Sequence, residues 1–245
     1  MSDQYHLILA STSPRRREFL TLLGIPFTAV SPRVSGDVDE TPLPNEPPDQ
    51  LVQRLSRLKA QAVAKNLASF PSIDGLSETH HLVIIAADTI VVLDESILGK
   101  PHSAAAASQM LKSLRGRQHE VYSGLTLIHR PPSTNPTSKQ HIATDLHRSQ
   151  VWMRPYSNAE ITAYVTGGSP LDKAGAYGIQ DQPFAPVERL EGCFASVMGL
   201  PLAQLAGRLR QIGLSLPEVN LLCSRHTGVD CCQLSANPHL TGIIS

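Results

Sequence analysis

Short β-branched apolar runs recur along the chain and predict the strands of a sheet. The longest run covers residues 82–93 and does not alternate with polar residues, which is typical of a strand buried on both faces. Asp88 is the only ionisable residue in it, and a carboxylate there needs a metal, a cation or hydrogen bonds. The other predicted strands lie at residues 5–10, 27–30, 97–101, 121–129 and 149–154.

Apolar residues at helical spacing predict helices between these strands. A long helix capped by Asp49 and running to about residue 68 buries one arc of its surface. Lys59 lies inside that arc, so it either snorkels to the surface or points inwards to an anionic partner, and its position favours the second. Further helices are expected at residues 14–23, 103–116, 157–168 and 201–213, the third of them opened by a capping box.

The first strand leads into a turn rich in hydroxyl and basic side chains. Ser13 is expected to be the N-cap and Pro14 the first residue of the following helix. Residues 15–17 are all arginine, although the helix dipole disfavours cations at a helix N-terminus. Such a turn is either an anion site, most naturally for phosphate, or a solvated basic turn. Taken alone, the two interpretations are equally good.

Composition narrows the function classes. The 245 residues are 41% hydrophobic, enough for one α/β domain, and Lys+Arg and Asp+Glu balance at 21 each, which argues against a nucleic-acid partner. No apolar run is long and uncharged enough to span a membrane, and residues 1–4 do not resemble a signal peptide. Four cysteines without C-x-x-C spacing favour a reducing, cytoplasmic setting.

Cations and carboxylates in unusual places suggest chemistry on a polyphosphate. Arg16, Lys59 and Lys100 can neutralise phosphates, while Asp88 and Glu40 can bind a divalent ion. Oxygen ligands favour Mg²⁺ or Mn²⁺ over zinc. A Walker-type phosphate loop is absent, as is the nucleophile elbow of acyl hydrolases.

The segment Leu9-Ala10-Ser11-Thr12-Ser13-Pro14-Arg15-Arg16 with Glu18 resembles the signature of the Maf nucleotide pyrophosphatases. Similar motifs follow in order and at compatible spacing over roughly residues 7–213. They include Ala87-Asp88-Thr89-Ile90-Val91, Gly99-Lys100-Pro101, Asp172-Lys173-Ala174-Gly175-Ala176-Tyr177-Gly178-Ile179-Gln180 and Val197-Met198-Gly199-Leu200-Pro201-Leu202.

The resemblance implies an α/β fold similar to the inosine-triphosphate pyrophosphatases, with an elongated mixed sheet flanked by helices and a cleft between two lobes. It implies hydrolysis of a nucleoside triphosphate to the monophosphate and pyrophosphate, with Asp88 as the base for a metal-associated water. Glu40 would share the Mg²⁺ or Mn²⁺ with Asp88. The phosphates would lie among Ser11, Ser13, Arg16, Lys59 and Lys100. The specificity positions Arg15, Thr89 and Gln180 are similar to those of relatives acting on dTTP and UTP.

The chain also departs from the family pattern. Ser169 stands where many relatives have glutamate, and Asp181 stands where glycine is usual. Both lie beside the expected base pocket and therefore bear on base selection. The loops at residues 69–81 and 131–139 exceed the compact pattern. We expect a catalytic domain at residues 1–213 and an appendage of unknown role at 214–245.

Two other functions fit the same motifs. One keeps the reaction but takes a modified nucleotide, such as 7-methyl-GTP or a methylated pyrimidine triphosphate. The other is a non-catalytic nucleotide-binding regulator of cell division, a role also associated with the family. The set Arg15, Thr89 and Gln180 separates the modified-nucleotide enzyme from the dTTP/UTP enzyme. The carboxylate of Asp88 separates the regulator from both, because a pure binder has no need of it in a central strand. The expected partners are a nucleotide substrate and, by the resemblance alone, a second copy in a homodimer.

Overall fold

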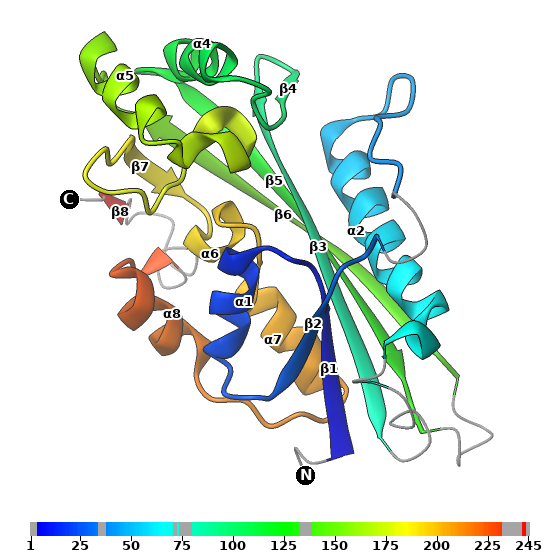
Figure 1. Ribbon diagram of the computed structural model, residues 1–245. Coiled ribbons are helices and arrows are strands. Elements are labelled where there is room, and N and C mark those ends of the chain that lie inside the picture. Colours follow the sequence, from blue (N-terminus) through cyan, green and yellow to red (C-terminus); the bar gives the residue numbers. More distant parts are fainter. Residues whose placement is uncertain are drawn as a thin grey trace.

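A single mixed β-sheet forms the centre of the computed structural model, which describes residues 4–33, 38–70, 73, 80–132, 139–231 and 242–243 (Figure 1). Within these residues the strand order is β2-β1-β3-β5-β6-β7-β8, with β4 paired to β3. Strands β1, β2 and the first half of β3 are parallel, whereas all other pairs are antiparallel. The strands are β1 Tyr5–Ala10, β2 Phe27–Val30, β3 His81–Leu93, β4 Ser96–Leu98, β5 Gln118–Arg130, β6 His141–Met153, β7 Val187–Glu191 and β8 Gly242–Ile243.

Helices cover both faces of this sheet. Helix α2 lies on one face, and α1, α6, α7 and α8 lie on the other, while α4 and α5 lie near the end where β3 turns into β4 (Figure 1). No described helix is both long and apolar enough to cross a membrane. The helices are α1 Pro14–Thr21, α2 Pro48–Lys65, α4 Ala104–Leu114, α5 Asn158–Thr166, α6 Phe194–Val197, α7 Leu202–Gln211 and α8 Val219–Thr227, with short 3₁₀ turns η2 Leu67–Ser69, η3 Ser169–Asp172 and η4 Ala174–Ala176.

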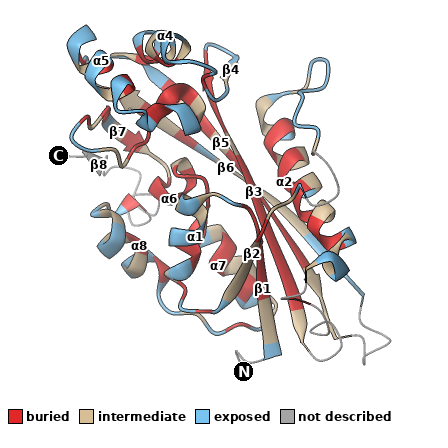
Figure 2. Ribbon diagram, viewed as in Figure 1, coloured by how far each residue is buried: buried red, intermediate tan, exposed pale blue. Residues whose placement is uncertain are grey.

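Strand β3 is buried on both faces along nearly all of its length (Figure 2). Side chains alternate across a strand, so odd-numbered residues such as Val83, Ile85 and Val91 enter the larger core under α1, α6 and α7. Even-numbered residues such as Ile84 enter the cores beneath α2. Asp88 and its neighbour Thr89 therefore point to opposite faces of the sheet.

A gap interrupts one edge of β3. Strand β1 pairs with β3 only as far as Leu9 opposite Ile85, and β4 begins its pairing at Leu98 opposite Val91. Within the described residues, no strand pairs with residues 86–90 on that side. Strands β1 and β4 both end at this gap, so the segments that follow them start beside it. Groups from both faces of β3 can therefore serve one site.

Helix α2 approaches the sheet unusually closely at Gly124 of β5. A Cβ atom at this position would lie 2.2 Å from the carbonyl oxygen of Val52 in α2, so the contact requires glycine. Gly124 is also the register partner of Asp88. The missing side chain therefore sets the distance between α2 and the strand that bears Asp88.

Most of the predicted elements are confirmed. The strands at residues 5–10, 27–30 and 82–93, the return strand after residue 96 and the capping box of Ser157 and Glu160 are observed. Strands β5 and β6 are longer than expected, because their polar outer ends continue the hairpin ladder. The segments 34–37, 71–72, 74–79 and 133–138 lie outside the described residues.

Ser13 is the N-cap of α1 and Pro14 is its first residue, as predicted, although the Ser13 side chain makes no cap hydrogen bond. Two other local predictions are wrong. Pro47, rather than Asp49, is the N-cap of α2, and Asp49 lies in the first turn. The sequence around Gly175 and Gly178 predicts an extended segment at residues 171–180, but the 3₁₀ turns η3 and η4 take up residues 171–172 and 174–176.

The region beyond residue 213 also contains structure that the apolar pattern does not show. Helix α8 lies there, and Val219 and Cys223 of this helix are buried in the larger core. The helix is short, and its apolar residues do not mark one face, since Leu221 is half exposed while Val219 and Cys223 are buried; no periodicity therefore predicts it. The domain limit at residue 213 stays a prediction.

Candidate active site

A buried ion pair joins helix α2 to the central strand. The Lys59 Nζ lies 2.5 Å from Asp88 Oδ1, and the two residues are only 8% and 6% exposed. Glu40, in the loop before α2, places Oε1 3.2 Å from the same Nζ. Lys59 thus points inwards and lies between two carboxylates, as its place on the apolar arc of α2 predicts. Its ammonium compensates the buried charge of Asp88.

The turn after β1 presents a second cation. The Arg16 Nε donates to the carbonyl oxygen of Gly199 at 2.9 Å, and its Nη1 donates to Ser11 Oγ at 3.3 Å. Ser11 also accepts the backbone N–H of Ser13 at 3.1 Å. Burial lowers the pKa of Arg16, whereas the nearby charges of Asp88 and Glu40 act in the opposite direction. Arg16 therefore lies close to the carboxylate cluster while both of its hydrogen-bond partners are neutral.

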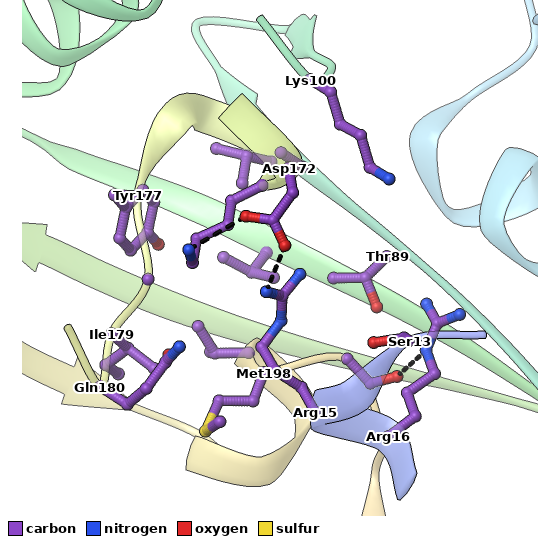
Figure 3. A pocket seen from close by; sticks show the side chains of 17 residues that line it. Ser13, Arg15, Arg16, Thr89, Lys100, Asp172, Tyr177, Ile179, Gln180 and Met198 are labelled. Carbon is purple, nitrogen blue, oxygen red and sulfur yellow. Dashed lines mark hydrogen bonds and ion pairs between the residues drawn. The ribbon is translucent and has the colours of Figure 1, made fainter. Parts of the chain in front are cut away.

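A cavity of about 140 Å³ lies beside this turn, on the Thr89 face of β3 (Figure 3). Its polar end is formed by Ser13, Arg16 and Lys100. Lys100 follows β4, is exposed, and forms no ion pair with a described carboxylate. The remaining lining residues are Arg15, Thr89, Val91, Val121, Asp172, Lys173, Ala174, Tyr177, Gly178, Ile179, Gln180, Val197, Met198 and Gly199.

The three expected specificity residues all line this cavity. Arg15 donates from Nη1 to Asp172 Oδ2 at 2.9 Å, so the two residues connect α1 to η3 (Figure 3). Thr89 Oγ1 lies 2.7 Å from Ser123 Oγ, and Ser123 donates to the carbonyl oxygen of Ser196 at 2.8 Å. Because Ser123 has only one proton, the Thr89 hydroxyl donates to Ser123 and offers lone pairs to the cavity.

The structure thus brings the predicted residues together in two adjoining groups. Ser13, Arg15, Arg16, Thr89, Lys100 and Gln180 line the cavity, and Ser11 contacts Arg16. Glu40, Lys59 and Asp88 form the cluster on the α2 face of β3 and do not line the cavity. The two groups lie on opposite faces of β3, at the point where residues 86–90 are unpaired on one side. Arg17 is exposed, as expected of a solvated residue.

Sequence reasoning missed the buried support of the cavity. Ser123 orients Thr89, and His119 Nε2 lies 2.7 Å from the hydroxyl of the cavity residue Tyr177. Burial lowers the pKa of His119 to about 4, so the ring is neutral at pH 7. Only the pairing of β3 with β5 places these side chains under the cavity.

The carboxylates of Glu40 and Asp88 are the candidate ligands of the expected divalent metal. Within the described residues no cluster of three or more acidic, histidine or cysteine side chains forms a ready-made metal site. Glu40 and Asp88 nevertheless lie near each other, since one oxygen of each lies within 3.2 Å of the Lys59 ammonium. Mg²⁺ is commonly held by one or two carboxylates together with substrate phosphates. The residues therefore fit a metal whose coordination the substrate completes.

A family model and several sequence relatives match most of the chain. The family model described as Maf-like protein matches residues 6–212. The chain is 38% identical over 210 residues to a dTTP/UTP pyrophosphatase of Dictyoglomus thermophilum, covering 86% of this chain and 97% of that protein. It is 44% identical over 217 residues to a dTTP/UTP pyrophosphatase of Salinibacter ruber, covering 87% and 94%. Among solved structures, a HAM1 protein from Coxiella burnetii matches with a TM-score of 0.41 at 12% identity, covering 84% and 99%.

Proposed function

This chain belongs to the Maf-like protein family, and from that premise we propose that it is a nucleoside triphosphate pyrophosphatase acting on dTTP and UTP. The observation that supports the proposal best is the ion pair of Lys59 and Asp88 beside a cation-lined cavity. A buried carboxylate next to phosphate-binding cations suits hydrolysis better than binding alone, because it adds nothing to the affinity for an anion.

In the proposed reaction a water attacks the α-phosphorus and the bond to the β-phosphate oxygen breaks, which releases the monophosphate and pyrophosphate. Asp88 accepts the proton of that water. Arg16 and Lys100 bind phosphate oxygens at the polar end of the cavity and neutralise the charge that develops there. Lys59 keeps the carboxylate of Asp88 in place, and Ser11 and Ser13 offer hydroxyl groups to the phosphates.

Glu40 and Asp88 are the residues that would hold Mg²⁺ or Mn²⁺. When bound, the ion neutralises phosphate charge and makes its water more acidic. The base would lie at the other end of the cavity, against Tyr177, Ile179 and Gln180. The amide of Gln180 can pair with the adjacent O4 and N3–H groups of uracil or thymine. Arg15 and Thr89 border the same space.

The test is pyrophosphate release by the purified chain from a panel of nucleoside triphosphates, with Mg²⁺, Mn²⁺ or a chelator. We expect release from dTTP and UTP, loss of release with the chelator, and loss of turnover in Asp88→Asn with nucleotide binding retained. Asp94→Asn is the matched control, since this exposed aspartate directly follows the same strand. No release from any triphosphate would refute the enzymatic function, and a preference for purines would refute the pyrimidine assignment.

Arg16→Gln and Arg17→Gln form a second matched pair, because the two arginines are neighbours and only Arg16 lines the cavity. The Arg16 variant should bind the triphosphate about tenfold or more weakly, as expected for the loss of a charge-assisted hydrogen bond. The Arg17 variant should resemble the wild type. Equal effects in the two variants would show that the turn acts only through its overall charge.

A further inference from the structure

The wall of the cavity at its base end rests on one buried carboxylate. The Asp181 side chain lies against the backbone of Gly178, where an added Cβ would be 2.6 Å from Asp181 Oδ1. The Asp181 N–H donates to the Gly178 carbonyl at 3.1 Å, and the Gly178 N–H donates to the Tyr164 hydroxyl at 3.2 Å. Residues 178–180 of the wall are thus attached to Asp181 and Tyr164, which do not line the cavity themselves.

Asp181 in turn has three side-chain partners. Its Oδ2 accepts the hydrogen bond of the Tyr164 hydroxyl and, at 3.1 Å, that of the Ser169 hydroxyl. Lys173 Nζ lies 3.4 Å away, and the side chains of Lys173 and Asp181 are only 9% and 12% exposed. Burial, followed by the hydrogen bond to Asp181, raises the pKa of Tyr164, so the phenol stays protonated and donates.

Lys173 extends the network to the opposite side of the cavity. Its Nζ donates to the Ser169 carbonyl at 2.5 Å and pairs with Asp172 Oδ1 at 3.0 Å. Asp172 also pairs with Arg15, so a continuous series of polar contacts runs from Asp181 to the start of α1. A change at Asp181 therefore reaches both the wall that bears Gln180 and the opposite side.

From this network we propose that Asp181 is a positioning residue for base selection, which fixes the wall at residues 178–180 so that the cavity accepts a pyrimidine and excludes a purine. The inference rests on the proposed function, since it concerns the substrate base of that reaction. Residues 178–180 line the base end of the cavity, so a wall that moves outwards there would admit the larger ring system. No contact joins Asp181 to the cations Arg16 and Lys100 or to the cluster of Glu40, Lys59 and Asp88, so its effect should fall on selectivity and KM.

A substitution at Ser169 can test whether the carboxylate must be attached at residue 181 or only has to lie beside Lys173. Its hydroxyl lies 3.2 Å from Lys173 Nζ, so a glutamate at residue 169 would place a carboxylate beside the same ammonium. The two departures from the family pattern, Ser169 and Asp181, thus meet at one lysine. The double variant Ser169→Glu with Asp181→Gly keeps the charge but moves its attachment from the wall to η3.

The experiment measures kcat and KM for UTP, dTTP and GTP by pyrophosphate release, with thermal melting of every variant. The variants are Asp181→Gly, Asp181→Asn and the double variant, and Glu188→Gln is the control for loss of one exposed acidic charge. We expect Asp181→Gly to raise the GTP-to-UTP ratio of kcat/KM about tenfold or more, mainly through KM, because small changes in a pocket shift selectivity by such factors. Asp181→Asn should lie between, and the double variant should return towards the wild-type ratio.

Unchanged selectivity, within about twofold, in both single variants would overturn the inference, and the isosteric asparagine keeps this outcome readable if the glycine variant folds poorly. A double variant as unselective as Asp181→Gly would also overturn the role of the carboxylate. A wild type that releases no pyrophosphate from any triphosphate would instead refute the proposed function. An active, pyrimidine-selective wild type with equally selective variants would refute only the role of Asp181.

Discussion

Replacing Lys59 with methionine tests the ion pair at the centre of the site. The substitution keeps most of the side-chain volume and removes the ammonium that lies 2.5 Å from Asp88 Oδ1. Within the described part of the chain, Lys59 is the only basic side chain paired with Asp88, which is 6% exposed. Breaking a buried pair from one side costs about 3–5 kcal/mol of unfolding free energy. We expect Lys59→Met to fall in that range.

Asp88→Asn should cost less, although it breaks the same pair. Lys59 would keep Glu40, whose side chain is 44% exposed and whose Oε1 lies at 3.2 Å. The loss is then closer to that of one hydrogen bond to a charged group, about 1.5–3 kcal/mol. The double variant Lys59→Met with Asp88→Asn removes both charges of the pair, so neither remains without its partner. Its loss of unfolding free energy should therefore be smaller than the sum of the two single losses by about 2 kcal/mol or more.

Urea denaturation followed by circular dichroism gives the four unfolding free energies of this cycle. The exposed pair of Arg117 and Asp94 is the matched control; its atoms lie 2.7 Å apart, and its side chains are 46% and 68% exposed. Its coupling should be about 0.2–1 kcal/mol. If the losses of unfolding free energy at Lys59 and Asp88 add to within about 0.5 kcal/mol in the double variant, the two residues do not form a stabilising buried pair. A larger loss in Asp88→Asn than in Lys59→Met would refute the secondary role of Glu40.

Three further predictions concern the support of the site. Gly124→Ala places a Cβ 2.2 Å from the Val52 carbonyl oxygen, so α2 must move; we expect about 1–3 kcal/mol of destabilisation in urea and reduced turnover, and unchanged values would refute the close contact. Burial lowers the pKa of His119 from 6.5 to about 4. Between these pH values His119 is therefore protonated in the unfolded chain and neutral in the folded chain. Stability should fall by up to about 3 kcal/mol as the pH drops from about 6.5 to 4, and a urea midpoint profile that is not flattened by His119→Gln would contradict this. Arg15→Gln and Asp172→Asn should change KM for UTP in the same direction, since each breaks the same ion pair, and opposite shifts would show that Arg15 acts on the base alone.

The sequence predicts the parts of the fold in which local pattern and burial agree. The uninterrupted apolar run around Asp88 predicts a central strand, and the position of Lys59 on an apolar arc predicts that it points inwards. Both predictions are confirmed. The second holds because burying a charge without a partner is costly, so a buried lysine must lie beside an anionic group. The mixed α/β architecture follows in the same way from the alternation of helical and strand periods.

Contacts that depend on strand register could not be predicted. Thr89 meets Ser123, and Asp88 lies opposite Gly124, only because β3 and β5 pair in one of many possible registers. The glycine-containing segment before Gln180 was expected to be extended. Gly175 has a φ of 69°, a left-handed conformation that kinks the chain within η4. Because glycine adopts left-handed and extended conformations about equally readily, its presence does not predict which one the segment takes.

The gap between β1 and β4 also bears on aggregation. An unpaired stretch of strand is usually a template on which another chain can add, and proteins protect such edges with charge, bulges or covering segments. Here the unpaired stretch at residues 86–90 lies inside the sheet, with β1 closing one end and β4 the other. A foreign strand would have to displace one of them before it could pair over a useful length. Within the described residues, the gap therefore leaves backbone groups of the central strand unpaired without offering a foreign strand a long template at this point of the sheet.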